Sequence, residues 1–100
     1  MKDPFEHFDK AFENKIRLQI MSVLVVNAYY EFNTLKELLN VTDGNLASHL
    51  KALEKEEYIE VVKGFNGRKP NTKYYASKAG RAAFVKHLNT LEKLINTQKN

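Results

Sequence analysis

The sequence predicts a single, mainly α-helical domain with one small β-hairpin. Apolar residues recur every three or four positions in five separate stretches, which is the spacing of helices. Two strand-like segments after residue 57 flank an Asn66-Gly67 turn signal, which indicates a hairpin. One hundred residues are enough for one such domain, and no linker, repeat or low-complexity tract divides the chain.

The composition excludes several kinds of protein. The chain has no cysteine, which excludes disulfides and thiolate metal sites. The first ten residues carry charges where a signal peptide needs an apolar run, and no apolar run approaches the ~20 residues of a membrane span. We therefore expect a cytoplasmic protein.

Charge is distributed unevenly along the chain. Residues 1–60 hold eleven acidic and seven basic side chains, whereas residues 61–100 hold one acidic and nine basic side chains. No carboxylate occurs between Val61 and Leu91. A field of one sign over a third of the chain favours a polyanionic partner such as nucleic acid, with a merely solvated basic surface as the alternative.

The first elements are predicted from aromatic and apolar spacing. Phe5, Phe8 and Phe12 predict a short amphipathic helix after Pro4, whose rings pack on a neighbouring element or on a second subunit. Residues 14–28 are apolar around almost the whole circumference and predict a helix in the centre of the core. Residues 29–33 form a loop, or a short strand if the hairpin needs a third partner.

Residues 34–57 have the pattern of a helix-turn-helix. Thr34 and Glu37 fit a capping box, which predicts a short helix from Thr34 to about Asn40, a residue that tolerates a left-handed backbone. Thr42 and Asp43 then cap a longer helix. A short helix, a tight turn and a longer helix make up the helix-turn-helix arrangement.

The longer helix is expected to have two contrasting faces. Leu46, Leu50 and Leu53 form an apolar seam toward the core. The opposite face carries small and cationic residues, namely Gly44, Ser48, Lys51 and Lys55, flanked by Asn45 and Ala52. Small residues permit close approach to a flat partner and lysines suit an anionic one, as in helices that enter the DNA major groove. The alternative is an ordinary amphipathic surface helix.

Residues 58–63 and 73–76 predict the two strands of the hairpin. Residues 64–72, GFNGRKPNT, are expected to form a long loop between them, and such loops are usually functional or disordered. Arg68 and Lys69 at its tip are placed to reach a phosphate backbone or a minor groove.

Ser77 caps a final helix that runs from Lys78 to about Thr97. Its apolar residues step by four, three and four positions, as in a coiled-coil seam: Phe84, Leu88, Leu91 and Ile95. Pairing with the same helix of a second copy would bury this seam. The alternative is that the helix folds back over the phenylalanines of its own N-terminal segment.

Three segments carry motifs of a known family. KIRLQIMSVL is similar to an R-L-x-I-L first helix through Arg17 and Leu18. TLKELLNVTDGNLASHLKALEKEEYIEV is similar to L-x-x-L-L-x-L-T-x-G-N-L-S-x-H-L-x-x-L-E-x-x-G-L-V, and YYASKAGRAAFVKHL to a Y-x-L-T-x-x-G-R entry into the final helix. Over roughly residues 13–95 the chain thus resembles the winged helix-turn-helix regulators of the MarR and ArsR class. Glu57 departs from the pattern, which often has glycine there.

The resemblance implies a winged helix-turn-helix with a three-helix core. Residues 1–12 would be an N-terminal arm, residues 58–76 the wing and residues 77–97 a dimerisation helix. The implied function is a transcriptional regulator that binds double-stranded DNA as a homodimer, without a cofactor. The implied DNA contacts are Thr42, Asn45, Ser48, His49, Lys51 and Lys55 on the helix-turn-helix, and Lys63, Arg68, Lys69 and Lys73 on the wing. The implied dimer contacts are Phe5, Phe8, Phe12, Phe84, Leu88, Leu91 and Ile95.

Two parts of this assignment have alternatives. His49 either contacts DNA or is a half-buried histidine that packs internally. An effector ligand, if one exists, would have to bind in a cleft between the first and last helices, lined by Phe8, Phe12, Phe84 and Leu88.

Other classes of function receive less support from the sequence. The three histidines lie on separate elements without carboxylates at metal-ligand spacing, and no nucleophile motif or glycine-rich phosphate loop occurs, so we expect neither an enzyme nor a metal site. Some winged helices bind proteins, but they do not need a cationic hairpin. Single-strand binding would require exposed aromatic platforms, for which Phe65, Tyr74 and Tyr75 are the candidates.

Overall fold

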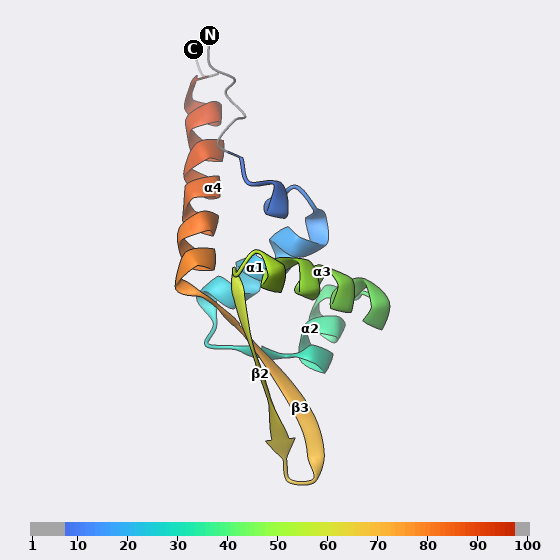
Figure 1. Cartoon of the computed structure of the whole chain (residues 1–100). Coiled ribbons are helices and arrows are strands. Elements are labelled where there is room, and N and C mark those ends of the chain that lie inside the picture. Colours follow the sequence, from blue (N-terminus) through green and yellow to red (C-terminus); the bar gives the residue numbers. More distant parts are fainter. Residues whose placement is uncertain (1–7, 98–100) are drawn as a thin grey trace.

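The computed structural model describes residues 8–97, which form four α-helices, a short 3-10 helix and a three-stranded antiparallel sheet (Figure 1). The elements are η1 (Lys10–Phe12), α1 (Lys15–Val26), β1 (Tyr30–Glu31), α2 (Phe32–Leu39), α3 (Asp43–Lys55), β2 (Ile59–Asn66), β3 (Lys69–Ala76) and α4 (Lys78–Thr97). The β2–β3 hairpin and α4 project in opposite directions from the body, which gives a long molecule of 59 × 25 × 21 Å. The predicted winged helix-turn-helix with its long final helix is confirmed.

The core lies between α1, α2, α3 and one face of the sheet. Helix α1 is central to it, as predicted, with Ile20, Met21 and Leu24 fully buried. Helix α3 contributes the predicted seam of Leu46, Leu50 and Leu53, which the other core residues surround. Full burial of one such side chain contributes about 1.5–3 kcal/mol, so this seam fixes the orientation of α3 about its axis.

The start of α2 differs from the prediction. The helix begins at Phe32 rather than Thr34, its N-cap is Glu31 and no side chain caps it. The cause is the preceding strand, in which Tyr30 pairs with Tyr74 of β3. This pairing places Phe32 against the core, where the centroids of the Phe32 and Tyr74 rings are 6.5 Å apart. Packing of Phe32 therefore outweighs the capping box, which is wrong, while the short-strand alternative for residues 29–33 is confirmed.

The turn between α2 and α3 is closed by a left-handed residue. Asn40 has φ 53° and ψ 55°, as predicted, and its N–H and that of Val41 donate to the carbonyls of Glu37 and Lys36. This pair of bonds satisfies two carbonyls at the end of α2 and turns the chain sharply. The Thr42 hydroxyl then accepts from the Asn45 N–H at 3.2 Å, which confirms Thr42 as the cap of α3.

Helix α3 ends with the same geometry, although its left-handed residue is a glutamate. The N–H groups of Glu57 and Tyr58 donate to the carbonyls of Glu54 and Leu53, and Glu57 has φ 62°. Glu57 thus adopts the conformation for which the related motif often has glycine. A residue with a Cβ pays roughly 1–2 kcal/mol in the left-handed region.

We expect Glu57→Gly to stabilise the protein by about 0.5–1 kcal/mol, because it relieves this strain at an exposed position. Glu56→Gly is the matched control, because Glu56 has φ −77° and a right-handed backbone, so glycine brings no relief there. Denaturant unfolding of both variants measures the difference. A Glu57→Gly variant no more stable than the wild type would contradict the prediction.

The hairpin is longer and tighter than predicted. Strands β2 and β3 pair continuously from Ile59↔Ala76 to Asn66↔Lys69, so a two-residue turn replaces the expected nine-residue loop. Gly67, the first turn residue, has a positive φ of +67°, whereas the φ of Arg68, the second, is not positive. This is the pattern of a type II′ turn. The turn signal correctly marked Gly67, but Asn66 is the last residue of β2, and the neighbouring residues extend the strands instead of forming a loop.

The N-terminal segment packs on its own chain. Of the predicted helix the structure describes residues 8–12, where Lys10–Phe12 form a short 3-10 helix and Phe8 and Asp9 are not helical, while Phe5 lies outside the described residues. Phe12 is 2% exposed and meets Phe84 edge to face at 5.6 Å between ring centroids. The assignment of these two rings to a dimer interface and to an effector cleft is therefore wrong, because they fill the core together.

Asp9 fastens this segment to the body. Its carboxylate accepts from the Ala11 N–H at 2.9 Å and from the Tyr58 hydroxyl at 2.5 Å, and its own N–H donates to Nδ1 of His87 at 3.3 Å. The hydrogen bond to Asp9 is the main cause, ahead of burial, that raises the pKa of Tyr58 to about 12. The segment is thus tied to the end of α3 and to α4 at once.

Candidate nucleic-acid interface

The candidate site begins with the outward face of α3. Because the leucine seam is buried, the residues on the opposite side are turned to solvent, and Gly44, Asn45, Ser48, Lys51 and Lys55 are all exposed. A Cβ added at Gly44 would meet nothing within 4 Å, so this part of the helix is uncovered. The candidates Asn45, Ser48, Lys51 and Lys55 therefore lie with Gly44 on one accessible face of the helix, as the sequence predicted.

An ion pair at the start of α3 was missed by the sequence analysis. The Lys36 ammonium lies 2.8 Å from the Asp43 carboxylate, across the turn of the helix-turn-helix. Both side chains are well exposed, so the pair adds little to stability. Its effect is electrostatic, because Lys36 offsets a carboxylate that would otherwise repel phosphates near the first turn of α3. A lysine seven residues before the capping aspartate was the available signal.

His49 lies apart from the other candidates. It is half-buried, and its Nδ1 is 3.3 Å from a terminal guanidinium nitrogen of Arg17. Arg17 in turn donates through Nε to the Ala11 carbonyl at 2.7 Å. Burial and, second, the Arg17 charge lower the pKa of His49. The neutral imidazole thus joins α3 to α1 and the N-terminal segment, a role that the motif comparison alone did not suggest for Arg17.

We expect Arg17→Leu to raise the pKa of His49, because it removes a neighbouring positive charge. In the wild type the lowered pKa keeps the His49 ring neutral in the folded protein. The stability that the neutral ring contributes is therefore present above pH ~6.5 and is lost as the pH falls through the lowered pKa. Titration of the His49 ring by NMR measures the shift. Lys51→Leu, which removes an exposed cation from the far side of α3, serves as the control. Equal His49 titration in wild type and Arg17→Leu would contradict the prediction.

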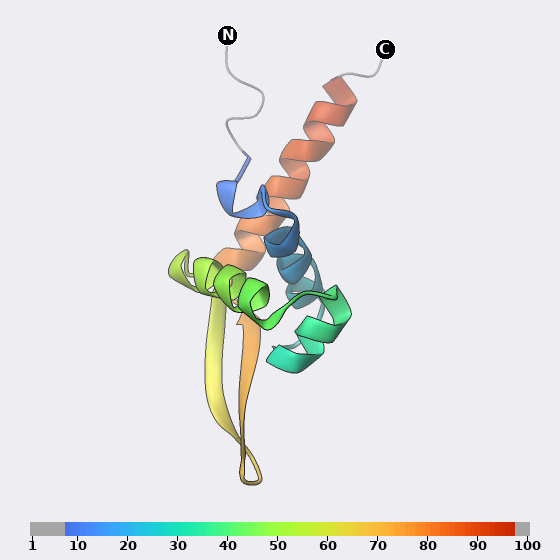
Figure 2. The same cartoon turned by 90° about the vertical axis from the view of Figure 1, so that its right-hand side faces the viewer.

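The hairpin, which we call the wing (residues 59–76), carries the second group of candidates. Lys63, Arg68 and Lys69 are exposed, and the last two lie at or beside the turn, at the end of the molecule away from α4 (Figure 2). Lys73 differs, because it is half-buried and its ammonium lies 4.6 Å from the centroid of the Tyr29 ring. Side chains alternate along a strand, so Lys73 is on the opposite face of the sheet from Tyr74, which packs on the core.

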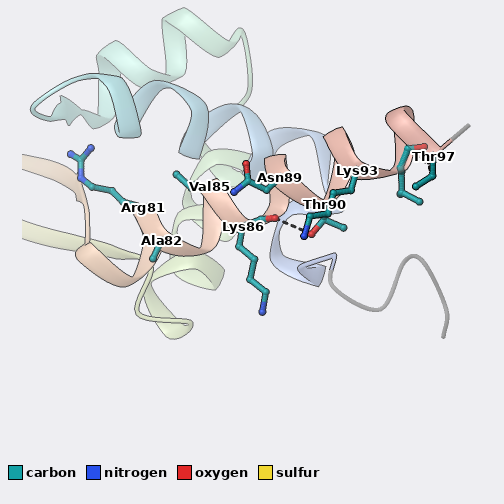
Figure 3. A pocket seen from close by; sticks show the side chains of 9 residues that line it. Arg81, Ala82, Val85, Lys86, Asn89, Thr90, Lys93 and Thr97 are labelled. Atoms are coloured by element: carbon teal, nitrogen blue, oxygen red, sulfur yellow. Dashed lines mark hydrogen bonds between the residues drawn. The ribbon is translucent and has the colours of Figure 1, made fainter. Parts of the chain in front are cut away.

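Two of the hollows on the surface of residues 8–97 lie away from these residues. The larger, of about 780 Å³, follows one side of α4, and every residue that lines it comes from that helix (Figure 3). It is therefore an uncovered helix face rather than an enclosed site. The smaller, of about 460 Å³, lies where Phe8, Asp9 and Lys10 meet Tyr58 and the first turns of α4.

Residues 8–97 contain neither a cluster of metal ligands nor a helix suited to span a membrane. No group of three or more His, Cys, Asp or Glu side chains in this range is placed to hold a metal ion. None of the helices described is both long enough and apolar enough to cross a membrane.

Comparison with known proteins connects this geometry to a family. Residues 16–95 match the family described as winged helix DNA-binding domain. The uncharacterized protein MJ0432 of Methanocaldococcus jannaschii is 39% identical over 79 residues, which are 79% of this chain and 86% of that protein. The range matched by the family, residues 16–95, includes the whole helix-turn-helix and the wing.

Solved structures show the same fold. A transcriptional regulator homologue of Pyrococcus horikoshii OT3 has a TM-score of 0.83 at 27% identity, and the match covers 90% of this chain and 89% of that chain. The putative transcriptional regulator ytfH of Salmonella typhimurium has a TM-score of 0.70 at 20% identity, with 90% and 87% covered. The likeness thus extends beyond the helix-turn-helix to nearly the full length of each chain.

Proposed function

The chain belongs to the winged helix DNA-binding domain family, and from this premise we propose that it is a transcriptional regulator that binds double-stranded DNA sequence-specifically as a homodimer. The observation that carries the proposal is the exposed face of α3, where small and cationic side chains replace the bulky charged residues usual on a surface helix. The resemblance to the MarR and ArsR class of regulators agrees with it.

Helix α3 would read base edges in the major groove. Asn45 can pair bidentately with adenine, and Ser48 can donate to or accept from several base edges. The Thr42 hydroxyl already accepts from the Asn45 N–H, so Thr42 would position Asn45 as much as contact DNA itself. Lys51 and Lys55, further along the same face, would lie near phosphates. Because His49 is hydrogen-bonded to Arg17, we assign it the role of holding α3 against α1, in addition to any contact with DNA.

The wing would add contacts outside the major groove. Lys63, Arg68 and Lys69 are exposed on a rigid paired hairpin, and arginine is favoured in narrow minor grooves. We also expect Lys73 to contribute charge, although its ammonium lies over the Tyr29 ring in a cation–π contact. The absence of any carboxylate between Val61 and Leu91 makes this part of the chain attractive to a phosphate backbone throughout.

Helix α4 supports the homodimer. Beyond Phe84 its seam is no longer covered by the domain, and Leu88, Leu91 and Ile95 are 45%, 45% and 54% exposed. Exposed apolar residues that continue one helical stripe mark a protein interface more often than a free surface. Two copies paired along α4 would place two α3 helices on successive turns of DNA, about 34 Å apart, over a pseudo-palindromic site.

The proposal is tested by selection from a random-sequence duplex pool, followed by affinity measurements at several salt concentrations. We expect a pseudo-palindrome to be enriched. Arg68→Ala/Lys69→Ala should weaken binding and reduce the slope of log affinity against log salt by about 1.8, because each lost phosphate contact removes about 0.9.

Lys86→Ala/Lys93→Ala is the matched control, since it removes the same charge from the exposed side of α4, away from α3 and the wing. A slope that falls equally in both variants would mean that the chain binds through net charge alone. No enrichment, together with binding that ignores the wing, would instead favour a winged helix that binds a protein.

A further inference from the structure

Phe65 is an apolar side chain in an unusual place. It lies on β2 two residues before the first turn residue of the wing, and it is 75% exposed. Burial of one phenyl ring contributes about 1.5–3 kcal/mol to stability. An exposed phenylalanine at the tip of a hairpin does not contribute this free energy to the fold. It is among the most exposed large apolar residues of the described chain.

The backbone determines the side of the wing on which Phe65 lies. Side chains alternate along β2, so Phe65 shares a face with Ile59 and Val61, which pack on the helices at the base of the wing. Its partner across the ladder is Pro70. Because the pairing continues past Phe65 to Asn66↔Lys69, the ring is carried by a paired two-stranded arm rather than by a loop.

Exposed cations lie close to Phe65 along the chain. Lys63 lies two residues earlier on the same face, Arg68 is in the turn, and Lys69 follows the turn on the opposite face, where it pairs with Asn66. An exposed apolar ring on an arm that carries positive charge fits a partner with a dense anionic exterior and an apolar interior within reach of it. Duplex DNA has this combination, with phosphates along the groove edges and stacked bases between them. The neighbouring face of α3 favours duplex DNA over other anionic partners.

We propose that Phe65 enters the minor groove as a wedge between adjacent base pairs and partly unstacks them. This inference rests on the proposed function and adds a source of specificity to it. An apolar wedge kinks the duplex, and pyrimidine–purine steps such as TA and CA are the easiest to unstack. The wing therefore selects a flexible step at a fixed distance from the bases that α3 reads.

The test uses the full chain and the duplex that it selects, with 2-aminopurine placed in turn at each position outside the α3 contacts. Wild type should raise 2-aminopurine fluorescence at one step and prefer TA or CA there over a stiff AA step. Phe65→Ala should abolish both effects and weaken binding about tenfold to a hundredfold, the range for loss of one aromatic–base stack. Its salt dependence and melting temperature should stay unchanged, because Phe65 is exposed and uncharged.

Val62→Ala is the matched control, since Val62 is a 50% exposed apolar residue of the same strand on the opposite face. An equal loss in Val62→Ala, or a Phe65→Ala variant that binds and unstacks like wild type, would overturn the wedge while the regulator remains. Wild-type binding confined to single strands and lost in Phe65→Ala would overturn both, in favour of a stacking platform. A wild type that binds no DNA would likewise overturn both.

Discussion

Gly80→Ala will destabilise the protein by about 3 kcal/mol or more, the largest single effect that we expect from a methyl group. A Cβ at this position would lie 2.0 Å from the carbonyl oxygen of Tyr58 and 2.8 Å from its carbonyl carbon. Both obstacles are backbone atoms, so no side chain can move aside. For a domain of this size the melting temperature should fall by roughly 12–24 °C.

The close approach results from hydrogen bonds that join the start of α4 to the residues that follow α3. The Ser77 N–H donates to the Tyr58 carbonyl at 3.0 Å, the Ser77 hydroxyl donates to the Glu57 carbonyl at 2.7 Å, and the Gly80 N–H donates to the Ser77 hydroxyl at 2.9 Å. A Cβ on Gly80 would push α4 away and strain all three bonds. Thermal and denaturant unfolding measure the cost.

Gly44→Ala is the control, because it makes the same change in an exposed helix with open space around it. There alanine should stabilise by about 0.5–1 kcal/mol through its higher helix propensity. Two glycine-to-alanine changes in one chain thus have opposite expected signs. A Gly80→Ala variant as stable as the wild type would show that α4 can shift without cost.

Leu91→Asp will convert the proposed dimer to a monomer. The change places a charge in the middle of the exposed seam of α4, where pairing would bury it without a partner. The mass in solution should fall from twice 11.6 kDa to 11.6 kDa, as measured by sedimentation equilibrium or light scattering. Affinity for the full pseudo-palindrome should fall about a hundredfold or more, since linkage of two half-sites raises avidity by about 10²–10⁴.

Asn89→Asp supplies the comparison, because it adds the same charge about 160° around the helix from Leu91. Asn89 is exposed and lines the hollow along the other side of α4. We expect Asn89→Asp to remain dimeric. If only Asn89→Asp became monomeric, the two copies would meet along that hollow instead. A wild type that is monomeric at all concentrations would contradict the dimer itself.

The wing and the N-terminal segment mark the limit of the sequence analysis. The position of the turn, at Gly67, was predicted correctly, but the length of the strands was not, because a strand beyond the core has no alternating apolar pattern to reveal it. Phe12 and Phe84 were assigned to a partner copy because apolar spacing indicates that a face is covered without indicating what covers it. The arrangement of the chain assigns both rings to the core.

The sequence by itself determined the order of the four α-helices and the hairpin, the buried seam of α3 and the small, cationic face opposite it. These features depend on periodicity, capping and turn residues within a few positions of one another, so they can be read locally. The tertiary structure alone decided the start of α2, the bond between Arg17 and His49 and the need for glycine at position 80. Each of these depends on residues distant in the sequence, Tyr74, Arg17 and Tyr58, whose contacts outweigh or add to the local preferences.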